Sequence, residues 1–182
     1  LTGHIPKAYA KRNPGAQIDS VEWHGQEGHN VYMLNPNDER FSRIGKAFLE
    51  EQKKAYGTSH NYSSDIFNEL MPPSDEPAYL AKTSAAVYET MKSADKDAVW
   101  VMQGWLFVSA AGRKFWTKER MKPFLDSVPD DGMVILELYS ENRPRWQDTE
   151  AYYGKPWIWN MLHNFGGNIG MYGKAPFIAF EP

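Results

Sequence analysis

The stretch Ala98-Val99-Trp100-Val101-Met102-Gln103-Gly104-Trp105 decides the fold class of this chain. It is almost continuously apolar, which is typical of a strand in a parallel sheet that is buried on both faces. Two later segments repeat the pattern, one from Met133 to Glu141 and one from Pro156 to Phe165. The sequence therefore predicts a parallel sheet that contains several such strands.

Helical patterns separate the predicted strands. The helix expected from Asp38 to Tyr56 has acids in its first turn, lysines in its last turn and Gly57 directly after it, all of which are helix-end signals. A second helix begins after Ser74 or Asp75, and a third runs from about Thr117 to Val128. The apolar faces expected to be buried consist of Phe41, Ile44, Phe48 and Ala55 in the first helix, Tyr79, Leu80, Thr83, Val87 and Met91 in the second, and Met121, Phe124, Leu125 and Val128 in the third.

Two further segments, Gln17 to Trp23 and Tyr62 to Glu69, are also predicted as strands, which makes five in all. The predicted strand ends at Glu69, Trp105 and Glu141 are each 36 residues apart, the size of one strand-plus-helix unit. A doubly wound sheet and a (β/α)₈ barrel both fit this α/β alternation. Because no Gly-rich phosphate loop follows the first strand, we favour the (β/α)₈ TIM barrel.

The chain is short for a complete barrel. A whole (β/α)₈ barrel needs about 250 residues, whereas this sequence has 182 and no linker, repeat or low-complexity tract divides it. We therefore expect residues 1–182 to form a single domain that is an incomplete barrel, without the N-terminal strands and the C-terminal part.

Composition narrows the possible partners. The net charge of −3 has no basic stripe within it, which argues against nucleic acid and anionic lipid as partners. No apolar run approaches the roughly 18 residues that span a membrane. The absence of cysteine removes disulfides, thiolate metal ligands and cysteine nucleophiles. Seven Trp and ten Tyr suit a carbohydrate site, although an ordinary core also uses aromatic residues.

The residues at the predicted strand ends indicate the chemistry, because the active site of a barrel lies at the carboxyl ends of its strands. Two carboxylates, two indoles, two imidazoles and two amides would face one basin. A glycoside hydrolase needs such a set: an acid for the leaving oxygen, a carboxylate for the oxocarbenium-like carbon, and aromatic rings that hold the sugar. The strand-end pairs are Trp23-His24, Asn68-Glu69, Gly104-Trp105, Ser140-Glu141 and His163-Asn164.

Several of these residues have simpler interpretations. Glu141 precedes two arginines, Arg143 and Arg145, so it could form a structural ion pair. His163 could be a hydrogen-bonded core histidine, and the glycine-rich segment 166–170 is most simply a tight turn. A metal site at His24 and His29 is not favoured, and no cofactor is predicted.

Three long motifs resemble glycoside hydrolase family 89, the α-N-acetylglucosaminidases. They run from Asp65 to Pro77, from Ala98 to Phe107 and from Trp157 to Asn168, in the order of the family. The resemblance implies a (β/α)₈ domain that removes terminal α-linked N-acetylglucosamine from glycoconjugates with retention of configuration. It also implies a secreted or lysosomal location, with heparan sulfate as the substrate of animal members and mucin-type glycans as that of some bacterial members. Carried over by position, Glu69 is the general acid/base, and the sugar contacts are Trp23, Asn68, Trp105, Leu138 and Leu162.

The expected nucleophile is harder to place. In an α-linked N-acetylglucosaminide the leaving oxygen is cis to the acetamido group, so the amide cannot attack from the back and the protein must supply a second carboxylate. Retention requires that carboxylate about 5 to 5.5 Å from the acid. The family has it in a later motif that this chain does not match, so it is expected outside the chain, with Glu141 and Glu181 as candidates within it. The alternatives are a non-catalytic carbohydrate-binding remnant and a partial barrel with neither property.

Overall fold

The computed structural model describes residues 3–23, 26–162 and 179–180. In this part of the chain no helix is both long and apolar enough to cross a membrane. The elements are α1 (Lys7–Arg12), β1 (Ile18–Glu22), β2 (Asn30–Leu34), α2 (Glu39–Tyr56), β3 (Asn61–Ser63), α3 (Pro77–Ala94), β4 (Val99–Gln103), α4 (Trp105–Val108), α5 (Ala110–Phe115), α6 (Lys118–Asp126), η2 (Asp130–Gly132), β5 (Met133–Glu137), η3 (Trp146–Thr149), α7 (Glu150–Tyr153) and β6 (Trp157–Trp159).

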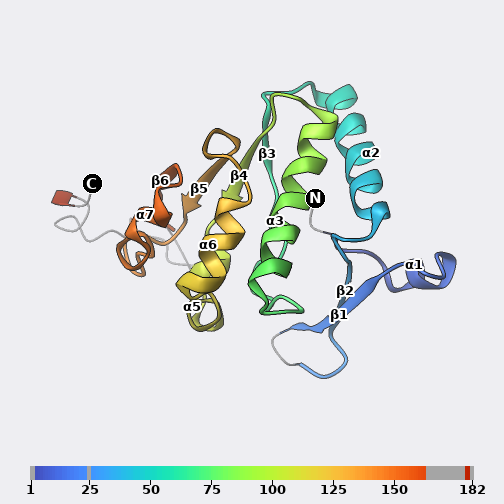
Figure 1. Cartoon of the computed structure of the whole chain (residues 1–182), viewed down its shortest axis with the longest axis horizontal. Helices are drawn as coiled ribbons and strands as arrows, with labels where there is room; N and C mark the ends of the chain where they lie inside the picture. Colours follow the sequence, from blue (N-terminus) through green and yellow to red (C-terminus); the bar gives the residue numbers. More distant parts are fainter. Residues whose placement is uncertain (1–2, 24–25, 163–178, 181–182) are drawn as a thin grey trace, which may run out of the picture.

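A four-stranded parallel sheet forms the centre of the fold. Its strands lie in the order β3-β4-β5-β6, and each neighbouring pair is parallel. Helices α3 and α6 lie side by side over one face of this sheet, and α2 packs on α3 beyond its β3 edge (Figure 1). Parallel neighbours in sequence order, each joined by a helical connection, are what the apolar runs and the 36-residue spacing predict.

The two faces of the sheet differ in burial. Along β4, Trp100 and Met102 are buried, and the Trp100 ring meets Phe124 of α6 with centroids 6.2 Å apart. Their neighbours Val99, Val101 and Gln103 are only half-buried, so the prediction that this strand is buried on both faces is wrong within the described residues. The reason is that helices cover one face, whereas the other is the face that a closed barrel turns toward its own interior.

The first predicted strand belongs to a different sheet. Ile18–Glu22 pairs antiparallel with β2, from Ile18 opposite Leu34 to Glu22 opposite Asn30, and this hairpin is separate from the parallel sheet. The prediction of a parallel barrel strand at residues 17–23 is therefore wrong. Period-two alternation reports a strand that is buried on one face, but it does not say which partner that strand takes.

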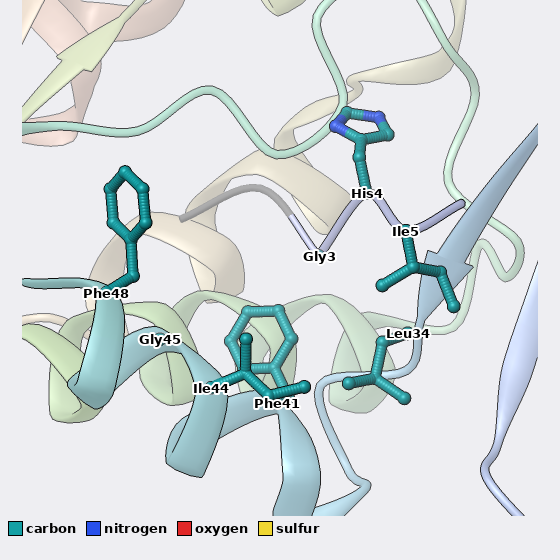
Figure 2. Close-up of a pocket in the computed structure, with 8 residues that line it drawn as sticks. All are labelled: Gly3, His4, Ile5, Leu34, Phe41, Ile44, Gly45 and Phe48. Atoms are coloured by element: carbon teal, nitrogen blue, oxygen red, sulfur yellow. The ribbon is translucent and has the colours of Figure 1, made fainter. Parts of the chain in front are cut away.

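Helix α2 has the predicted bounds but buries a different face. Asp38 caps it by accepting the backbone N–H of Arg40 at 2.9 Å, and Gly57 ends it. The buried residues are Phe41, Gly45 and Leu49, whereas Ile44 and Phe48 are 41% and 61% exposed, and Ala55 is exposed. Ile44 and Phe48 instead line a cavity of about 230 Å³ beside Gly3, His4 and Ile5 (Figure 2).

The other helices follow their predictions more closely. α3 begins at Pro77, two residues later than a cap at Ser74 would give and one later than a cap at Asp75, and buries Leu80, Thr83, Val87 and Met91. α6 buries Met121, Phe124 and Leu125. The connection from β5 to β6 holds a left-handed turn at α7, where φ lies between 51° and 56° for residues 150–153 and the fully buried Tyr152 anchors it.

Candidate active site

The loop that follows β3 carries the first candidate residues. β3 ends at Ser63, so the predicted strand through Glu69 is too long, and residues 64–71 form a loop instead. Ile66, Phe67 and Leu70 are between 1% and 3% exposed, and these buried side chains produce the apolar pattern that imitates a strand. The loop is therefore anchored in the core although it has no strand pairing.

Hydrogen bonds fix the shape of this loop. The Ser64 carbonyl accepts the indole N–H of Trp100 at 2.9 Å, and the Asp65 carboxylate accepts the backbone N–H of Asn68 at 2.8 Å. Asn68 has φ of 51°, the left-handed region that asparagine tolerates better than most residues. The turn closed by Asp65 and Asn68 sets the direction in which the next residue, Glu69, leaves the backbone.

Glu69 meets Trp105 from the neighbouring strand end. The indole Nε1 of Trp105 donates to Oε1 of Glu69 at 2.8 Å, and both side chains are half-buried. Trp105 is the first residue of α4, two residues beyond the end of β4. The intervening Gly104 lies so close to β5 that an added Cβ would be 2.7 Å from the Leu136 carbonyl oxygen, so only glycine permits this approach.

A cavity of about 340 Å³ opens beside this pair at the carboxyl edge of the sheet. The Tyr139 ring lies against Trp105, with centroids 6.1 Å apart. The lining combines one carboxylate, one guanidinium, two aromatic rings and small residues; its members are Glu69, Trp105, Ser109, Ala110, Ala111, Tyr139 and Arg143. A half-buried acid with aromatic walls is a setting suited to binding a sugar and exchanging a proton with it.

Asp65 adds a second carboxylate close to Glu69. Burial raises the pKa of Asp65, the hydrogen bond from the Asn68 backbone opposes that rise, and the negative charge of Glu69 adds to it. The two carboxylates therefore lie close enough for the ionisation of one to disfavour that of the other. Arg143 supplies a positive charge to the cavity lining.

Glu141 is held differently from the prediction. It is 2% exposed and forms no ion pair with Arg143 or Arg145 in the described part of the chain, so the structural ion pair considered for it is not present. Its Oε1 accepts the backbone N–H of Leu162 at 3.0 Å, while its Oε2 is buried and has no hydrogen-bond partner among the described residues. Glu141 thus ties the end of the β5 segment to the chain beyond β6.

Glu137, which sequence reasoning passed over, is a second buried carboxylate near the end of β5. It is fully buried and accepts the backbone N–H groups of Arg145 and Trp146, the latter at 3.0 Å. Burial raises the pKa of Glu137, although these hydrogen bonds oppose the rise. Its side chain does not line the cavity of Glu69, so its place in the fold is to fix the start of η3.

The predicted sugar contacts are only partly gathered. Trp105 lines the cavity of Glu69, and Asn68 precedes Glu69 in the same turn. Leu138 and Leu162 are half-buried residues at the carboxyl edge, and Trp23 is half-buried after β1, but none of these three lines that cavity. His24, His163, Asn164, the glycine-rich segment 166–170 and Glu181 lie outside the described residues.

Sequence reasoning missed Tyr139 and Arg143 as cavity residues. Tyr139 lies in the apolar run predicted to be a strand, and the sequence offers Arg143 only as a possible ion-pair partner for Glu141. A signal for Tyr139 was its place two residues beyond the buried strand end at Glu137, where a side chain can reach the carboxyl edge. Nothing in the sequence pattern marked Arg143 as a cavity residue.

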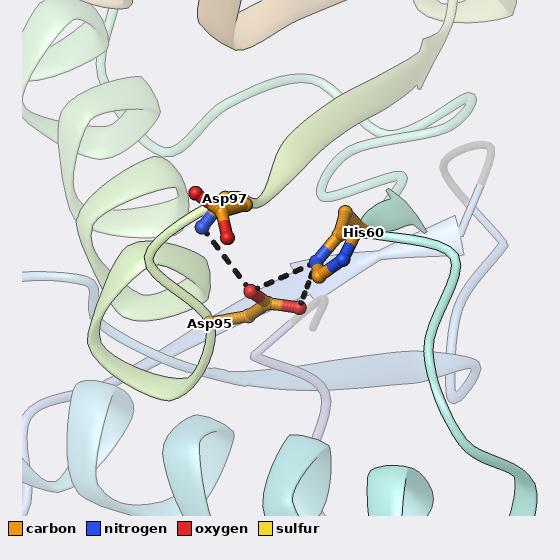
Figure 3. Close-up of side chains that lie close together, drawn as sticks. All are labelled: His60, Asp95 and Asp97. Carbon is orange, nitrogen blue, oxygen red and sulfur yellow. Dashed lines mark hydrogen bonds and ion pairs between the residues drawn. The ribbon is translucent and has the colours of Figure 1, made fainter.

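One cluster in the described part of the chain has metal-ligand types. The ligand atoms of His60, Asp95 and Asp97 all lie within 4.8 Å of one another (Figure 3). Both oxygens of Asp95 already accept hydrogen bonds, from Tyr62 at 2.6 Å, from His60 at 3.0 Å and from the Asp97 backbone N–H at 3.1 Å. The cluster lies at the amino ends of β3 and β4, opposite the edge that carries Glu69, and its satisfied bonds favour a structural network.

Comparison with known proteins identifies the family. The family described as "Alpha-N-acetylglucosaminidase (NAGLU) tim-barrel domain" matches residues 1–182. This chain belongs to that family. The barrel fold and the resemblance to glycoside hydrolase family 89 are thereby confirmed.

Individual relatives agree with the assignment. Human alpha-N-acetylglucosaminidase is 41% identical over 188 residues, which cover the whole of this chain and 25% of the human protein. A family 89 glycoside hydrolase from Clostridium perfringens, solved in complex with PUGNAc, superposes with a TM-score of 0.73 at 30% identity over 92% of this chain and 18% of its own. The same enzyme with two glutamates replaced by glutamine, in complex with its substrate GlcNAc-alpha-1,4-galactose, gives a TM-score of 0.72 at 28% identity over 93% of this chain and 18% of its own. The chain thus spans about a quarter of the length of the human relative and about a fifth of that of the bacterial one.

Proposed function

We propose that this chain carries the acid/base half of a retaining glycoside hydrolase that removes terminal α-linked N-acetylglucosamine from glycoconjugates. The observation that carries the proposal is Glu69: a half-buried carboxylate at the carboxyl edge of a barrel sheet, held by the Trp105 indole and lining a cavity with aromatic walls. Family membership supplies the substrate class, because the relatives are named for this activity and one is bound to GlcNAc-alpha-1,4-galactose.

In this proposal Glu69 acts twice. As the acid it donates its proton to the glycosidic oxygen while the bond from that oxygen to the anomeric carbon breaks and a carboxylate attacks from the opposite face. As the base it then takes a proton from the water that hydrolyses the glycosyl-enzyme ester, which returns Glu69 to its protonated state. Glu69 is the one carboxylate among the described residues that line the cavity, so we expect the nucleophile from elsewhere in the protein.

The finer parts of this proposal are predictions from the resemblance. Asn68, Trp23, Leu138 and Leu162 are predicted sugar contacts together with Trp105, and no cofactor is required by the mechanism. We also propose that the domain holds more barrel strands than the four in the described sheet, since a closed barrel of this type has eight. The secreted or lysosomal location and the heparan sulfate or mucin-type substrate stay predictions.

The test is hydrolysis of 4-nitrophenyl α-N-acetylglucosaminide by the whole protein that contains this chain and by its Glu69→Gln variant. We expect the variant to lose a factor of about 10² to 10⁴ in kcat, because the amide cannot donate or accept the proton that Glu69 transfers. Glu150→Gln is the matched control, since Glu150 is exposed and pairs with Lys118 at the surface. Equal turnover by Glu69→Gln and the parent protein would refute the assignment.

A second candidate function is sugar binding without turnover. The observation that favours it is that the described part of the cavity lining holds a single carboxylate, whereas a retaining hydrolase needs two. Under this function the chain binds 2-acetamido-1,2-dideoxynojirimycin in calorimetry but releases no nitrophenol from the aryl substrate. Release of nitrophenol that depends on Glu69 would exclude it.

A further inference from the structure

The contact between Glu69 and Trp105 bears on the ionisation of the acid. The Trp105 indole nitrogen lies 2.8 Å from Oε1 of Glu69. An indole N–H is a donor only and has no lone pair to offer. A proton on Oε1 would point one donor at another, so this contact favours the ionised carboxylate, which accepts the indole hydrogen.

We propose that Trp105 is a positioning residue for Glu69: its indole N–H holds Oε1 and favours the ionised carboxylate, and so helps to set the pH at which Glu69 releases the proton transferred to the glycosidic oxygen. The inference rests on the proposed function only in that this proton goes to a sugar, since the hydrogen bond itself belongs to the structure.

The position of Trp105 is itself well determined. It begins α4 directly after Gly104, whose backbone N–H donates to the Leu136 carbonyl at 2.8 Å, so the end of β4 is tied to β5. On its other side the indole lies against Tyr139. The donor therefore comes from the adjacent strand of the sheet and not from the loop that carries Glu69.

Other groups that face Glu69 act on its ionisation as well. Asp65 from the same loop disfavours the charged form, and Arg143, from the segment after β5, favours it. Tyr139, a further titratable residue, also lines the cavity. The Trp105 hydrogen bond favours the ionised carboxylate, so removing this donor alone should make Glu69 release its proton at higher pH.

The experiment is a carbon-13 NMR titration of the side-chain carboxyl groups in the full 182-residue chain, with the Glu69 signal assigned by its loss in Glu69→Gln. Trp105→Phe keeps an aromatic ring but removes the N–H donor. We expect the midpoint of the Glu69 titration to move upward by about 1 pH unit in this variant, the scale of one charge-assisted hydrogen bond at a half-buried site. Trp146→Phe is the matched control, because Trp146 stacks on Trp157 and does not line the cavity; its effect should be below about 0.2 pH unit.

A measurement on the parent chain keeps the proposal testable if Trp105→Phe fails to fold. The indole Nε1–H signal of Trp105 should shift with pH at the same midpoint as the Glu69 carboxyl, and that shift should vanish in Glu69→Gln. An indole signal that ignores the titration of Glu69, or a Trp105→Phe variant with an unchanged midpoint, would overturn the proposal.

The titration also separates this inference from the proposed function. It requires no turnover, so a chain that shows the coupled titration but never hydrolyses the aryl substrate would retain the Trp105 contact and lose the hydrolase assignment. Hydrolysis that depends on Glu69, combined with an unchanged titration in Trp105→Phe, would support the hydrolase assignment and refute the proposed role of Trp105.

Discussion

Removing one hydroxyl group from the Asp95 network should measurably destabilise the chain. Tyr62 is 6% exposed, and its hydroxyl donates to the Asp95 carboxylate at 2.6 Å. Tyr62→Phe keeps the ring in place and deletes the hydroxyl, which also contacts Oγ1 of Thr58 at 2.8 Å, so the change in buried apolar area is small. A hydrogen bond to a charged group contributes about 1.5 to 3 kcal/mol, and the buried carboxylate loses one of several donors. We expect the variant to be less stable by about 2 kcal/mol at pH 7, which lowers Tm by roughly 4 to 8 °C for a chain of this length.

The effect should depend on pH in a defined direction. Burial by itself raises the pKa of Asp95, but the hydrogen bonds from Tyr62, the Asp97 backbone, His60 and Thr58 outweigh it and hold that pKa well below the usual range. A carboxyl group with a depressed folded-state pKa stabilises the fold above its unfolded pKa of about 3.9, and the contribution is lost as pH falls toward the folded value. The deficit of Tyr62→Phe should therefore be full at pH 7 and should shrink progressively below about pH 4.

The assay is urea unfolding of the parent chain, Tyr62→Phe and Tyr56→Phe at pH 7 and at pH 3. Tyr56 is 88% exposed, so its variant should stay within about 0.5 kcal/mol of the parent. Equal stability of Tyr62→Phe and the parent at pH 7, or a deficit that does not change between the two pH values, would refute the reasoning.

Two further predictions concern packing. Phe41→Ala should lower the free energy of unfolding by about 3 to 5 kcal/mol and Phe48→Ala by less than about 1 kcal/mol, because Phe41 is 2% exposed and Phe48 is 61% exposed. Chemical denaturation of both variants measures these losses. Similar losses in the two variants would contradict the observed orientation of α2. Gly104→Ala should lower the free energy of unfolding of the chain by about 1 to 3 kcal/mol, because the new methyl group would lie 2.7 Å from the Leu136 carbonyl oxygen. An unchanged thermal unfolding transition would contradict this and would show that β4 and β5 can move apart there at little cost.

The sequence predicted the central sheet because apolar runs report burial directly. β4, β5 and β6 fall inside their predicted segments. The residues 36 positions apart, Glu69 and Trp105, were predicted to face one basin, and a hydrogen bond joins them. The same signal failed in the loop after β3. Ile66, Phe67 and Leu70 are as buried as strand residues, so hydrophobicity alone placed a strand where the chain turns.

Other features depend on relations that a linear pattern does not contain. The partner of β1 lies eight residues beyond it, across a loop, and period-two alternation does not specify an antiparallel hairpin. Helix α2 contains two neighbouring stripes of apolar or small residues, one through Phe41, Gly45 and Leu49 and one through Ile44 and Phe48. Which stripe is buried depends on the elements that pack on the helix. Tyr139 and Arg143 line the cavity because of the course of the backbone turns after β5. The residue types in those turns do not determine that course.

The left-handed conformation of Asn68 affects how substitutions at that position can be interpreted. Asn68 has two separable roles: its backbone supports the turn that aims Glu69, and its side chain is predicted to contact the sugar. Alanine would impose torsional strain on the loop as well as remove the amide, so any lost activity would mix both causes. Glycine accepts the same backbone angle and removes only the side chain. At this residue the informative truncation is therefore to glycine, and alanine scanning would overstate the contribution of the asparagine side chain.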